Sequence, residues 1–234
     1  RLWVTYEDYR DDIKISKDII NRLVETYRRI RNTLRFLHAN INNDFNPKTD
    51  AVPYEKFSYL DKWMMSRLNM LIEKVLKAYN NYSFHAIYHS LHNFCAVDLS
   101  ALYLDIVKDR IYVESKNSTK RRASQTVMFE TLVSFVKLLA PVLSYTAEEM
   151  WLYLKGNVEE ESVFLTTFPR VEKEYISGEL EEEWSRIWEL RELINKKIEE
   201  KRVEKVIGHS LDTKVIVTVP EKEYLLLNKL GDEL

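Results

Sequence analysis

Along residues 16–40, apolar side chains recur at intervals of three and four. Residues with this spacing form a single stripe on an α-helix, so the segment is predicted to be an amphipathic helix with one buried face. The stripe comprises Ile20, Leu23, Tyr27, Ile30, Leu34 and Leu37. The whole chain of 234 residues contains only 4 glycines and 5 prolines, which favours long helices over frequent turns. We therefore predict a mainly α fold.

Further helices are predicted along the first part of the chain. Ser58 and Asp61 have the spacing of a capping box, which indicates a helix that continues to Asn80. The segment at 83–112 is apolar almost all round, as expected of a central buried helix with a kink. A polar loop at 42–53 separates the first two of these helices.

Two more helices complete the predicted bundle. One runs from about residue 122 to residue 140 and ends at Pro141, because proline cannot continue a helix. Thr146 and Glu149 form a second capping-box pattern, which predicts a short helix that continues through Trp151. Residues 1–170 are therefore interpreted as one helical-bundle domain.

The composition changes after residue 170. A long helix is predicted at 181–206, and the alternating β-branched residues of 213–219 are typical of a strand. Residues 171–234 are therefore expected to form a small, truncated α+β segment. The strand is expected to pair partly with structure beyond this segment.

Bulk composition limits the possible functions. The formal net charge is -2, from 35 basic and 37 acidic residues, so a nucleic-acid surface would have to be local. Cys95 is the only cysteine, which excludes an internal disulfide and suits a reducing compartment such as the cytoplasm. The longest apolar runs are too short to span a bilayer, so no membrane partner is expected.

Four arginines occur among residues 28–35, inside the first predicted helix. At about 100° per residue, Arg28, Arg31 and Arg35 share one flank, Asn32 points away from the core, and Arg29 lies on the other side. Arginine forks onto phosphate oxygens, so such a row suits phosphate recognition. A solvated face, or salt bridges to acids of another helix, would explain the row equally well.

A second basic cluster comprises Lys116, Lys120, Arg121 and Arg122, in a loop and at the start of a predicted helix. Its signal is weak, because loops are often basic.

His85, His89 and His92 share one face of the central helix and could bind a metal. Three histidines on one helix cannot close a tetrahedral shell without a fourth ligand, so a packing role is favoured and no metal site is assigned. The chain contains no glycine-rich phosphate loop, nucleophile elbow or HExxH motif. No catalytic residue is therefore assigned.

Several segments resemble the anticodon-binding region of the bacterial-type isoleucyl-tRNA synthetases, which are class I aminoacyl-tRNA synthetases. They occur in the order of that family and cover nearly the whole chain. They are "YRRIRNTLRFL", "FHAIYHSLHNFCAVDLSALYLDIVKDRIY", "RRASQTVMFETL", "LLAPVLSYTAEEMW" and "EKVIGHSLDTKV". Two positions depart from the family pattern: His38-Ala39 stands where Leu-Gly is common, and His209 where lysine is common.

The resemblance implies a parent enzyme, a ligase that attaches isoleucine to its tRNA with ATP, of which this chain is the tRNA-binding part. The HIGH and KMSKS signatures are absent, so the chain alone is expected to be inactive. ATP and zinc are expected only in other parts of the parent, and this chain is expected to need no cofactor. The expected protein is a cytoplasmic monomer whose partner is the tRNA for isoleucine.

The resemblance also implies roles for individual residues. Arg28, Arg31 and Arg35 become phosphate and sugar ligands, and Asn32 becomes a base contact. Lys120, Arg121 and Arg122 are further tRNA-binding candidates. The alternatives are the anticodon-binding domain of the valine or leucine enzyme, a metal-binding helical bundle, and a scaffold that uses the 181–206 helix to bind a partner.

Overall fold

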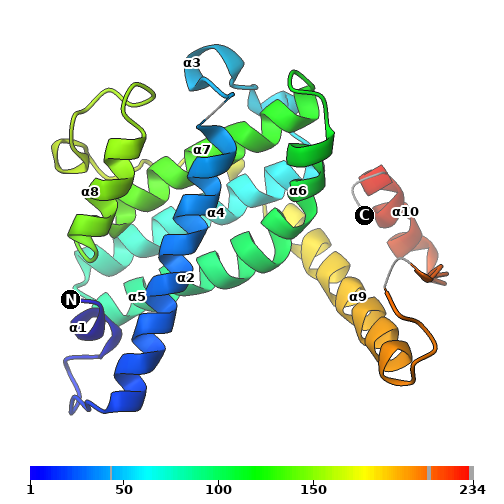
Figure 1. Ribbon diagram of the computed structural model, residues 1–234, viewed down its shortest axis with the longest axis horizontal. Coiled ribbons are helices and arrows are strands. Elements are labelled where there is room, and N and C mark those ends of the chain that lie inside the picture. Colours follow the sequence, from blue (N-terminus) through cyan, green and yellow to red (C-terminus); the bar gives the residue numbers. More distant parts are fainter. Residues whose placement is uncertain (43, 210–211, 232–234) are drawn as a thin grey trace. The chain divides into compact units, whose positions relative to one another are not determined.

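Helices form nearly all the regular structure in residues 1–42, 44–209 and 212–231, which the computed structural model describes (Figure 1). The mainly α prediction is confirmed. The α-helices are α1 (Leu2–Tyr6), α2 (Lys17–Ile41), α3 (Pro47–Asp50), α4 (Tyr59–Asn80), α5 (Phe84–Asn93), α6 (Leu104–Val113), α7 (Thr119–Leu139), α8 (Ser144–Tyr153), α9 (Gly178–Val203) and α10 (Glu221–Leu230). Shorter or wider helical turns are η1 (Tyr54–Lys56), η2 (Phe94–Tyr103), η3 (Val163–Leu165) and η4 (Lys173–Tyr175).

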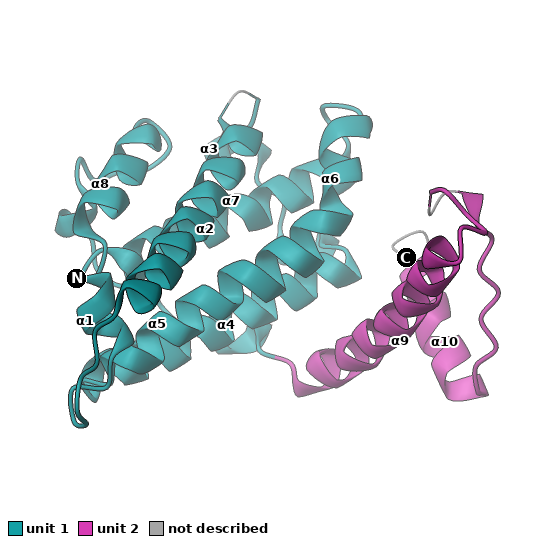
Figure 2. Ribbon diagram, turned by 60° about the horizontal axis from the view of Figure 1, so that its bottom comes forward, with its two compact units in different colours: residues 1–176 teal, residues 177–234 magenta. Residues whose placement is uncertain are grey.

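Packing divides the chain into two units, Arg1–Ile176 and Ser177–Leu234 (Figure 2). In the first unit, α4 packs against both α5 and α7, and α2 lies across this layer in contact with α7, η2 and α8 (Figure 1). The domain boundary predicted after residue 170 stays a prediction.

Helix α2 follows its predicted pattern closely. The side-chain oxygen of Ser16 accepts a hydrogen bond from the backbone N–H of Ile19 at 3.2 Å, which caps the first turn. The predicted stripe is buried from Leu23 through Leu37, with Tyr27 half-buried at its edge. Ile20 is the exception: 37% of its surface is exposed, because it lies in the first turn, before the packed part of the helix.

The central helix is continuous but has an unusual middle. Its two ends are α5 and α6, and the ten residues between them, η2, form a π-helix. In a π-helix each N–H bonds to the carbonyl five residues back, so the turns are wider than in an α-helix. The side chains of Phe94, Cys95, Leu99 and Tyr103 are buried here. The predicted buried helix is confirmed, and its irregularity is a widening of the turns.

The predicted start of α4 is confirmed, whereas α7 begins three residues before its predicted start. The side-chain oxygen of Ser58 accepts from the backbone N–H of Asp61 at 3.2 Å, as the capping pattern predicts. Helix α7 begins at Thr119 instead of residue 122, because Ser118 caps it through the N–H of Arg121 at 3.1 Å. It ends at Leu139, in agreement with the predicted stop at Pro141.

Two sequence predictions are wrong. Helix α8 begins at Ser144, so Thr146 lies inside the helix and not at its cap. Its hydroxyl instead shares a hydrogen bond of 3.1 Å with the hydroxyl of Tyr27. Residues 213–219, predicted to be a strand, have no regular secondary structure and pair with no other segment in the part of the chain that the structure describes.

A buried carboxylate joins four elements of the first unit. Asp61 on α4 is 0% exposed. It accepts hydrogen bonds from Tyr103 of η2 at 2.6 Å, from Ser124 of α7 at 3.2 Å and from Arg110 of α6 at 3.2 Å. Arg110 also donates to the hydroxyl of Ser58 at 2.9 Å. The carboxylate is therefore both paired and fully hydrogen-bonded, as a buried charge requires.

The second unit contains α9 and α10. Ser177 caps α9 by accepting from the N–H of Leu180 at 3.2 Å. Lys229 of α10 forms an ion pair of 2.6 Å with Glu183 of α9, so the two helices lie side by side (Figure 2). Among the described residues, no helix is long and apolar enough to span a membrane.

Replacing Asp61 should destabilise the first unit strongly. Asp61→Asn removes the charge that pairs with the mostly buried Arg110, and the loss of one partner of a buried ion pair lowers the free energy of unfolding by about 3 kcal/mol. Urea unfolding followed by circular dichroism measures the change.

Glu25→Gln is the matched control, because the Glu25 side chain is 69% exposed in its pair with Arg28. Exposed pairs contribute about 0–1 kcal/mol, so this variant should unfold almost as the unsubstituted chain does. Equal midpoints for the two variants would contradict the role of Asp61.

Candidate nucleic-acid interface

The solvent-facing side of α2 carries Asn32 with arginines around it. Arg28 forms an ion pair of 2.6 Å with Glu25 one turn earlier, and its side chain is 65% exposed. Asn32 and Arg35 are exposed, and neither has a hydrogen-bond or ion-pair partner among the described residues. This surface therefore presents a guanidinium and an amide whose donors face water.

Arg31 is held by a neighbouring helix. Its Nη2 lies 2.7 and 3.0 Å from the two carboxylate oxygens of Glu149 on α8. The hydrogen bond to Glu149 raises the pKa of the Arg31 guanidinium above its ordinary value. Glu149 was expected in a capping box; it instead fixes Arg31 beside the exposed Arg35.

A groove of about 630 Å³ runs between α2 and α8. Its lining includes Arg31, Asn32, Arg35, Glu149 and Tyr153. We call it the α2–α8 groove. The structure thus brings Arg31 and Arg35 together on one flank of α2, as the helical wheel predicts.

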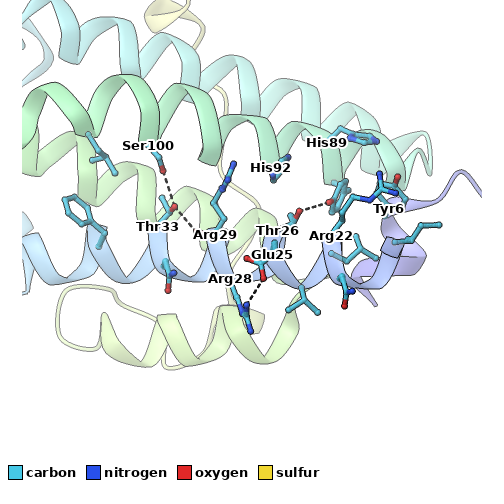
Figure 3. A pocket seen from close by; sticks show the side chains of 18 of the residues that line it. Tyr6, Arg22, Glu25, Thr26, Arg28, Arg29, Thr33, His89, His92 and Ser100 are labelled. Atoms are coloured by element: carbon cyan, nitrogen blue, oxygen red, sulfur yellow. Dashed lines mark hydrogen bonds and ion pairs between the residues drawn. The ribbon is translucent and has the colours of Figure 1, made fainter. Parts of the chain in front are cut away.

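A larger groove of about 1260 Å³ lies on the opposite flank of α2, and we call it the α2–α5 groove. Its walls come from α2 on one side and from α5, η2 and α6 on the other, with Tyr6 of α1 at one end (Figure 3). Its polar lining comprises Arg22, Glu25, Thr26, Arg28, Arg29, Asn32, Thr33, His89, His92, Ser100, Asp105 and Lys108, together with Asn21 and the two tyrosines Tyr6 and Tyr88.

Arg22 and Arg29 are functional candidates that the sequence prediction omitted. They are seven residues apart on α2 and therefore share a face. Their spacing is a signal in the sequence that could have identified them. The opposite wall of the groove comes from residues 88–108, and the periodicity of α2 gives no information about which distant residues face it. Arg28, assigned to the flank of Arg31 and Arg35, lines the α2–α5 groove instead.

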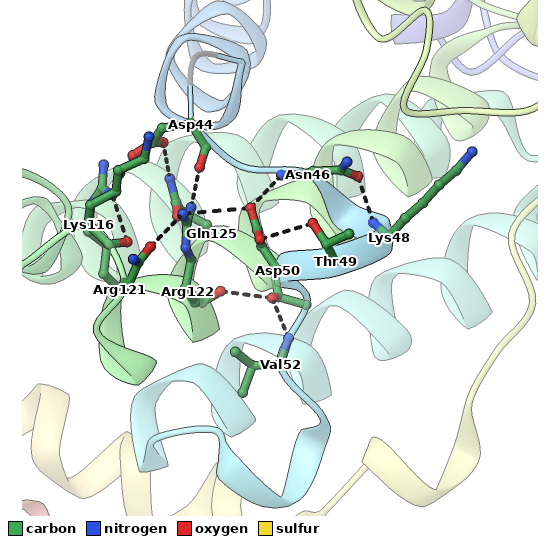
Figure 4. Close-up of polar contacts among 12 residues, drawn as sticks. Asp44, Asn46, Lys48, Thr49, Asp50, Val52, Lys116, Arg121, Arg122 and Gln125 are labelled. Atoms are coloured by element: carbon green, nitrogen blue, oxygen red, sulfur yellow. Dashed lines mark hydrogen bonds and ion pairs between the residues drawn. The ribbon is translucent and has the colours of Figure 1, made fainter.

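The second basic cluster divides into exposed and buried members, and Figure 4 shows the polar contacts of Arg121 and Arg122. Lys120 is exposed and has no partner among the described residues. Arg121 pairs with Asp44 and donates to the carbonyl of Ile111 at 3.0 Å. Arg122 is only 8% exposed; it donates to the carbonyl of Asp44 and, at 2.8 Å, to Gln125.

Arg121 and Arg122 therefore attach the connection after α2 to the first turn of α7. Burial raises the pKa of Asp44, but hydrogen bonds from Arg121 and Gln125 outweigh burial and hold that pKa below its ordinary value. Such charge-assisted contacts are typical of a structural joint. That the two arginines bind tRNA remains a prediction, and each has a structural role in addition.

The three histidines are not arranged as a metal centre. Among the described residues, no group of three His, Cys, Asp or Glu side chains is placed to hold a metal ion. The ring of His92 stacks on Tyr88 at 6.0 Å between centroids, and His89 meets the same ring edge-on at 5.1 Å. His85 lies 3.7 Å from the carboxylate of Asp8. Burial lowers the pKa of both His89 and His92.

Comparison with known proteins agrees with this architecture. The family model described as the anticodon-binding domain of tRNA ligase matches residues 61–217. The chain belongs to this family. The match begins at Asp61, the buried carboxylate of α4, and includes the whole of α5, η2, α6, α7 and α8.

Individual relatives extend the similarity over α2. The isoleucine–tRNA ligase of Petrotoga mobilis is 48% identical over 221 residues, which is 94% of this chain and 24% of the relative. That of Caldicellulosiruptor saccharolyticus is 52% identical over 217 residues, 92% of this chain and 24% of the relative. That of Geobacter sulfurreducens is 47% identical over 234 residues, 100% of this chain and 25% of the relative. The chain thus spans about a quarter of the length of these relatives.

One departure from the family pattern has a packing explanation. His38 is half-buried, and its ring lies 5.4 Å from that of Tyr153 on α8. Its Nε2 is 3.3 Å from the carbonyl of Tyr153. His38 therefore helps to hold α8 against α2 at the end of the α2–α8 groove.

Stability measurements should separate buried from exposed arginines. Arg122→Met leaves the carbonyl of Asp44 and the side chain of Gln125 without their donor, and unsatisfied buried groups lower the free energy of unfolding by about 1–3 kcal/mol each. Arg35→Met removes an exposed side chain without a partner, so the change should stay within about 0.5 kcal/mol. Urea unfolding of both variants tests this, and an Arg35→Met chain as unstable as Arg122→Met would contradict it.

Proposed function

We propose that this chain is the part of an isoleucine–tRNA ligase that binds the tRNA for isoleucine. The observation that carries the proposal is the exposed side of α2, where the side chains of Arg35 and Asn32 have no partner in the part of the chain that the structure describes and Arg31 is held beside them. Membership of the anticodon-binding domain family supports it, as do relatives named isoleucine–tRNA ligase over nearly the whole chain.

The charge arrangement fits an RNA backbone. Arginines close together on a helix repel one another, and phosphates relieve that repulsion. A guanidinium donates two parallel hydrogen bonds to a phosphate, so Arg28, Arg31 and Arg35 suit phosphate and sugar contacts. Asn32 lies next to this flank, its amide has no partner among the described residues, and it is the candidate for a base contact. Lys120 is exposed and belongs to a second candidate surface.

The whole protein has further expected properties. Attachment of isoleucine to tRNA with ATP belongs to the complete ligase, and its catalytic residues and any zinc site belong to parts outside this chain. The chain itself requires no cofactor for tRNA binding. The protein is a cytoplasmic monomer in this proposal.

The rival functions predict different behaviour. A metalloprotein would bind stoichiometric metal through His85, His89 and His92, and a scaffold would use α9 and bind no RNA. The valine and leucine enzymes would prefer other tRNAs. Titration with the tRNAs for isoleucine, valine and leucine therefore distinguishes all of these functions from the proposed one.

Replacement of Arg28, Arg31 and Arg35 by Gln should weaken tRNA binding. Each lost phosphate contact lowers the slope of log affinity against log salt by roughly 0.7–0.9. The preference among tRNAs should change little, because phosphate contacts carry no sequence information. Fluorescence anisotropy with labelled tRNA at several salt concentrations measures both properties.

The matched control replaces Lys48, Lys56 and Lys77, which are exposed in the same unit, by Gln. It removes the same charge and should leave the salt slope closer to that of the unsubstituted chain. Thermal melting of the arginine variant should change by only a few degrees, because its two ion pairs are partly exposed. An unchanged salt slope with a clearly lowered melting temperature would make these arginines structural.

The isolated chain should not activate isoleucine. The HIGH and KMSKS nucleotide-binding signatures do not occur in its 234 residues. Isoleucine-dependent exchange of pyrophosphate into ATP should therefore be undetectable with this chain and readily measured with the complete ligase as control. Exchange by the purified chain, resistant to further purification, would refute this part of the proposal.

A further inference from the structure

The α2–α5 groove has an uncompensated positive charge. The carboxylates in its lining are those of Glu25 and Asp105, and each has a cation close by: Arg28 at 2.6 Å and Lys108 at 2.7 Å. Arg22 and Arg29 are exposed, and no carboxylate of the described residues pairs with either. Two guanidiniums of this groove are therefore available to an anion.

The groove wall opposite α2 carries rings and hydroxyl groups. Figure 3 shows Arg29 reaching toward the helix of His92, while Arg28 points the other way. Burial lowers the pKa of His92, and the nearby charge of Arg29 lowers it further. Burial therefore favours the neutral ring of His92, in which one nitrogen donates and the other accepts a hydrogen bond.

The floor of the groove is held in place by its own hydrogen bonds. The hydroxyl of Tyr88 donates to Thr26 at 2.9 Å, and the hydroxyls of Thr33 and Ser100 lie 3.3 Å apart (Figure 3). These bonds link α2 to α5 and η2 directly beneath the cations. The two walls thus keep a fixed separation, which suits a site that is formed before its ligand arrives.

The two grooves beside α2 are adjacent and share two lining residues. Asn32 and Phe36 line both the α2–α5 groove and the α2–α8 groove. Arg22 and Arg29 lie on one side of this shared ridge, and Arg31 and Arg35 lie on the other. A polyanion that contacts Arg35 and passes over Asn32 therefore reaches Arg29 next.

We propose that the α2–α5 groove binds a single-stranded segment of the tRNA backbone, with Arg22 and Arg29 as ligands of separate phosphates. The seven residues between the two arginines place them about 10 Å apart along the helix axis, at 1.5 Å per residue. The RNA chain crosses α2 at Asn32, so that both flanks of the helix hold phosphates. This inference rests on the proposed function and extends its contact surface to a second flank.

A single strand fits the groove better than a duplex does. A cationic channel with ring side chains in its wall is the usual arrangement for single-stranded nucleic acid, because unstacked bases can pack on the rings. His89 is exposed in this wall, and the half-buried ring of His92 lines it. An acidic peptide would satisfy the arginines but would not use the rings.

The experiment compares two double variants of the same helix, with an exposed lysine pair as control. Arg22→Gln/Arg29→Gln should reduce the salt slope for binding of the tRNA for isoleucine by about 1.4–1.8, for two lost phosphate contacts. The ratio of the affinity of the unsubstituted chain to that of this variant should then fall about tenfold between 50 and 200 mM salt. Arg31→Gln/Arg35→Gln reports on the other flank, and Lys56→Gln/Lys77→Gln shows the effect of charge loss alone.

A conservative variant guards against a folding artefact. Arg22→Lys/Arg29→Lys keeps both charges and should keep most of the salt slope. Circular dichroism melting should give the same midpoint for both groove variants, because neither arginine has a protein partner among the described residues.

The outcomes separate this inference from the proposed function. A normal salt slope for the Arg22/Arg29 variant, together with a reduced slope for the Arg31/Arg35 variant, would overturn the groove site and leave the proposed function intact. Normal slopes for both would show that neither flank of α2 contacts phosphates and would overturn the groove site, whereas absence of tRNA binding by the unsubstituted chain would remove the proposed function itself. Binding of polyglutamate that depends on Arg22 and Arg29, with normal tRNA binding, would assign the groove to an acidic peptide.

Discussion

The carboxylate of Asp61 is the interaction on which the arrangement of the first unit depends. It is completely buried at the start of α4 and accepts bonds from η2, α6 and α7, so four segments meet at one charge. A buried charge needs all its partners at once, because each missing partner leaves part of the desolvation penalty unopposed. The hydrogen bonds to Asp61 therefore fix the positions of these helices relative to one another.

The position of α2 depends on the helices that meet at Asp61. Helix α2 packs on α7 and η2, two of the elements fixed at Asp61, and most of its buried side chains are apolar and so do not fix its orientation by themselves. Hydrogen bonds between hydroxyl groups fix the orientation of α2: Tyr27 bonds to Thr146, and Thr33 bonds to Ser100. The basic side of α2 is thus directed outward by interactions on its opposite face.

The sequence is sufficient to predict features that depend on local pattern. The extent of α2, the cap at Ser58 and the stop before Pro141 each follow from a few adjacent residues. The start of α7 was missed because Ser118 follows other polar residues, and any of them could have been the cap. The strand predicted at 213–219 is wrong because β-branched residues favour an extended chain but supply no partner strand.

The candidate site was less predictable from the sequence, because it depends on contacts between segments that are far apart in the chain. Periodicity correctly placed Arg31 and Arg35 on one flank, because both belong to one helix. It could not show that Asp44 pairs with Arg121 or that Glu149 pairs with Arg31, since these partners are 77 and 118 residues apart in the chain. It also could not reveal the wall of histidines and hydroxyls facing Arg29. Contacts between distant segments decide which cations are available.

The number of residues in the π-helix η2 sets the rotation of α6 relative to α5. Removing one residue between 94 and 103 would rotate α6 about the helix axis relative to α5, because each residue of a helix contributes a fixed turn. Arg110 would then leave Asp61, and Lys108 would leave the groove beside α2, although no side chain in either place had been altered. This stretch should therefore accept exchange of one apolar residue for another far more readily than an insertion or a deletion.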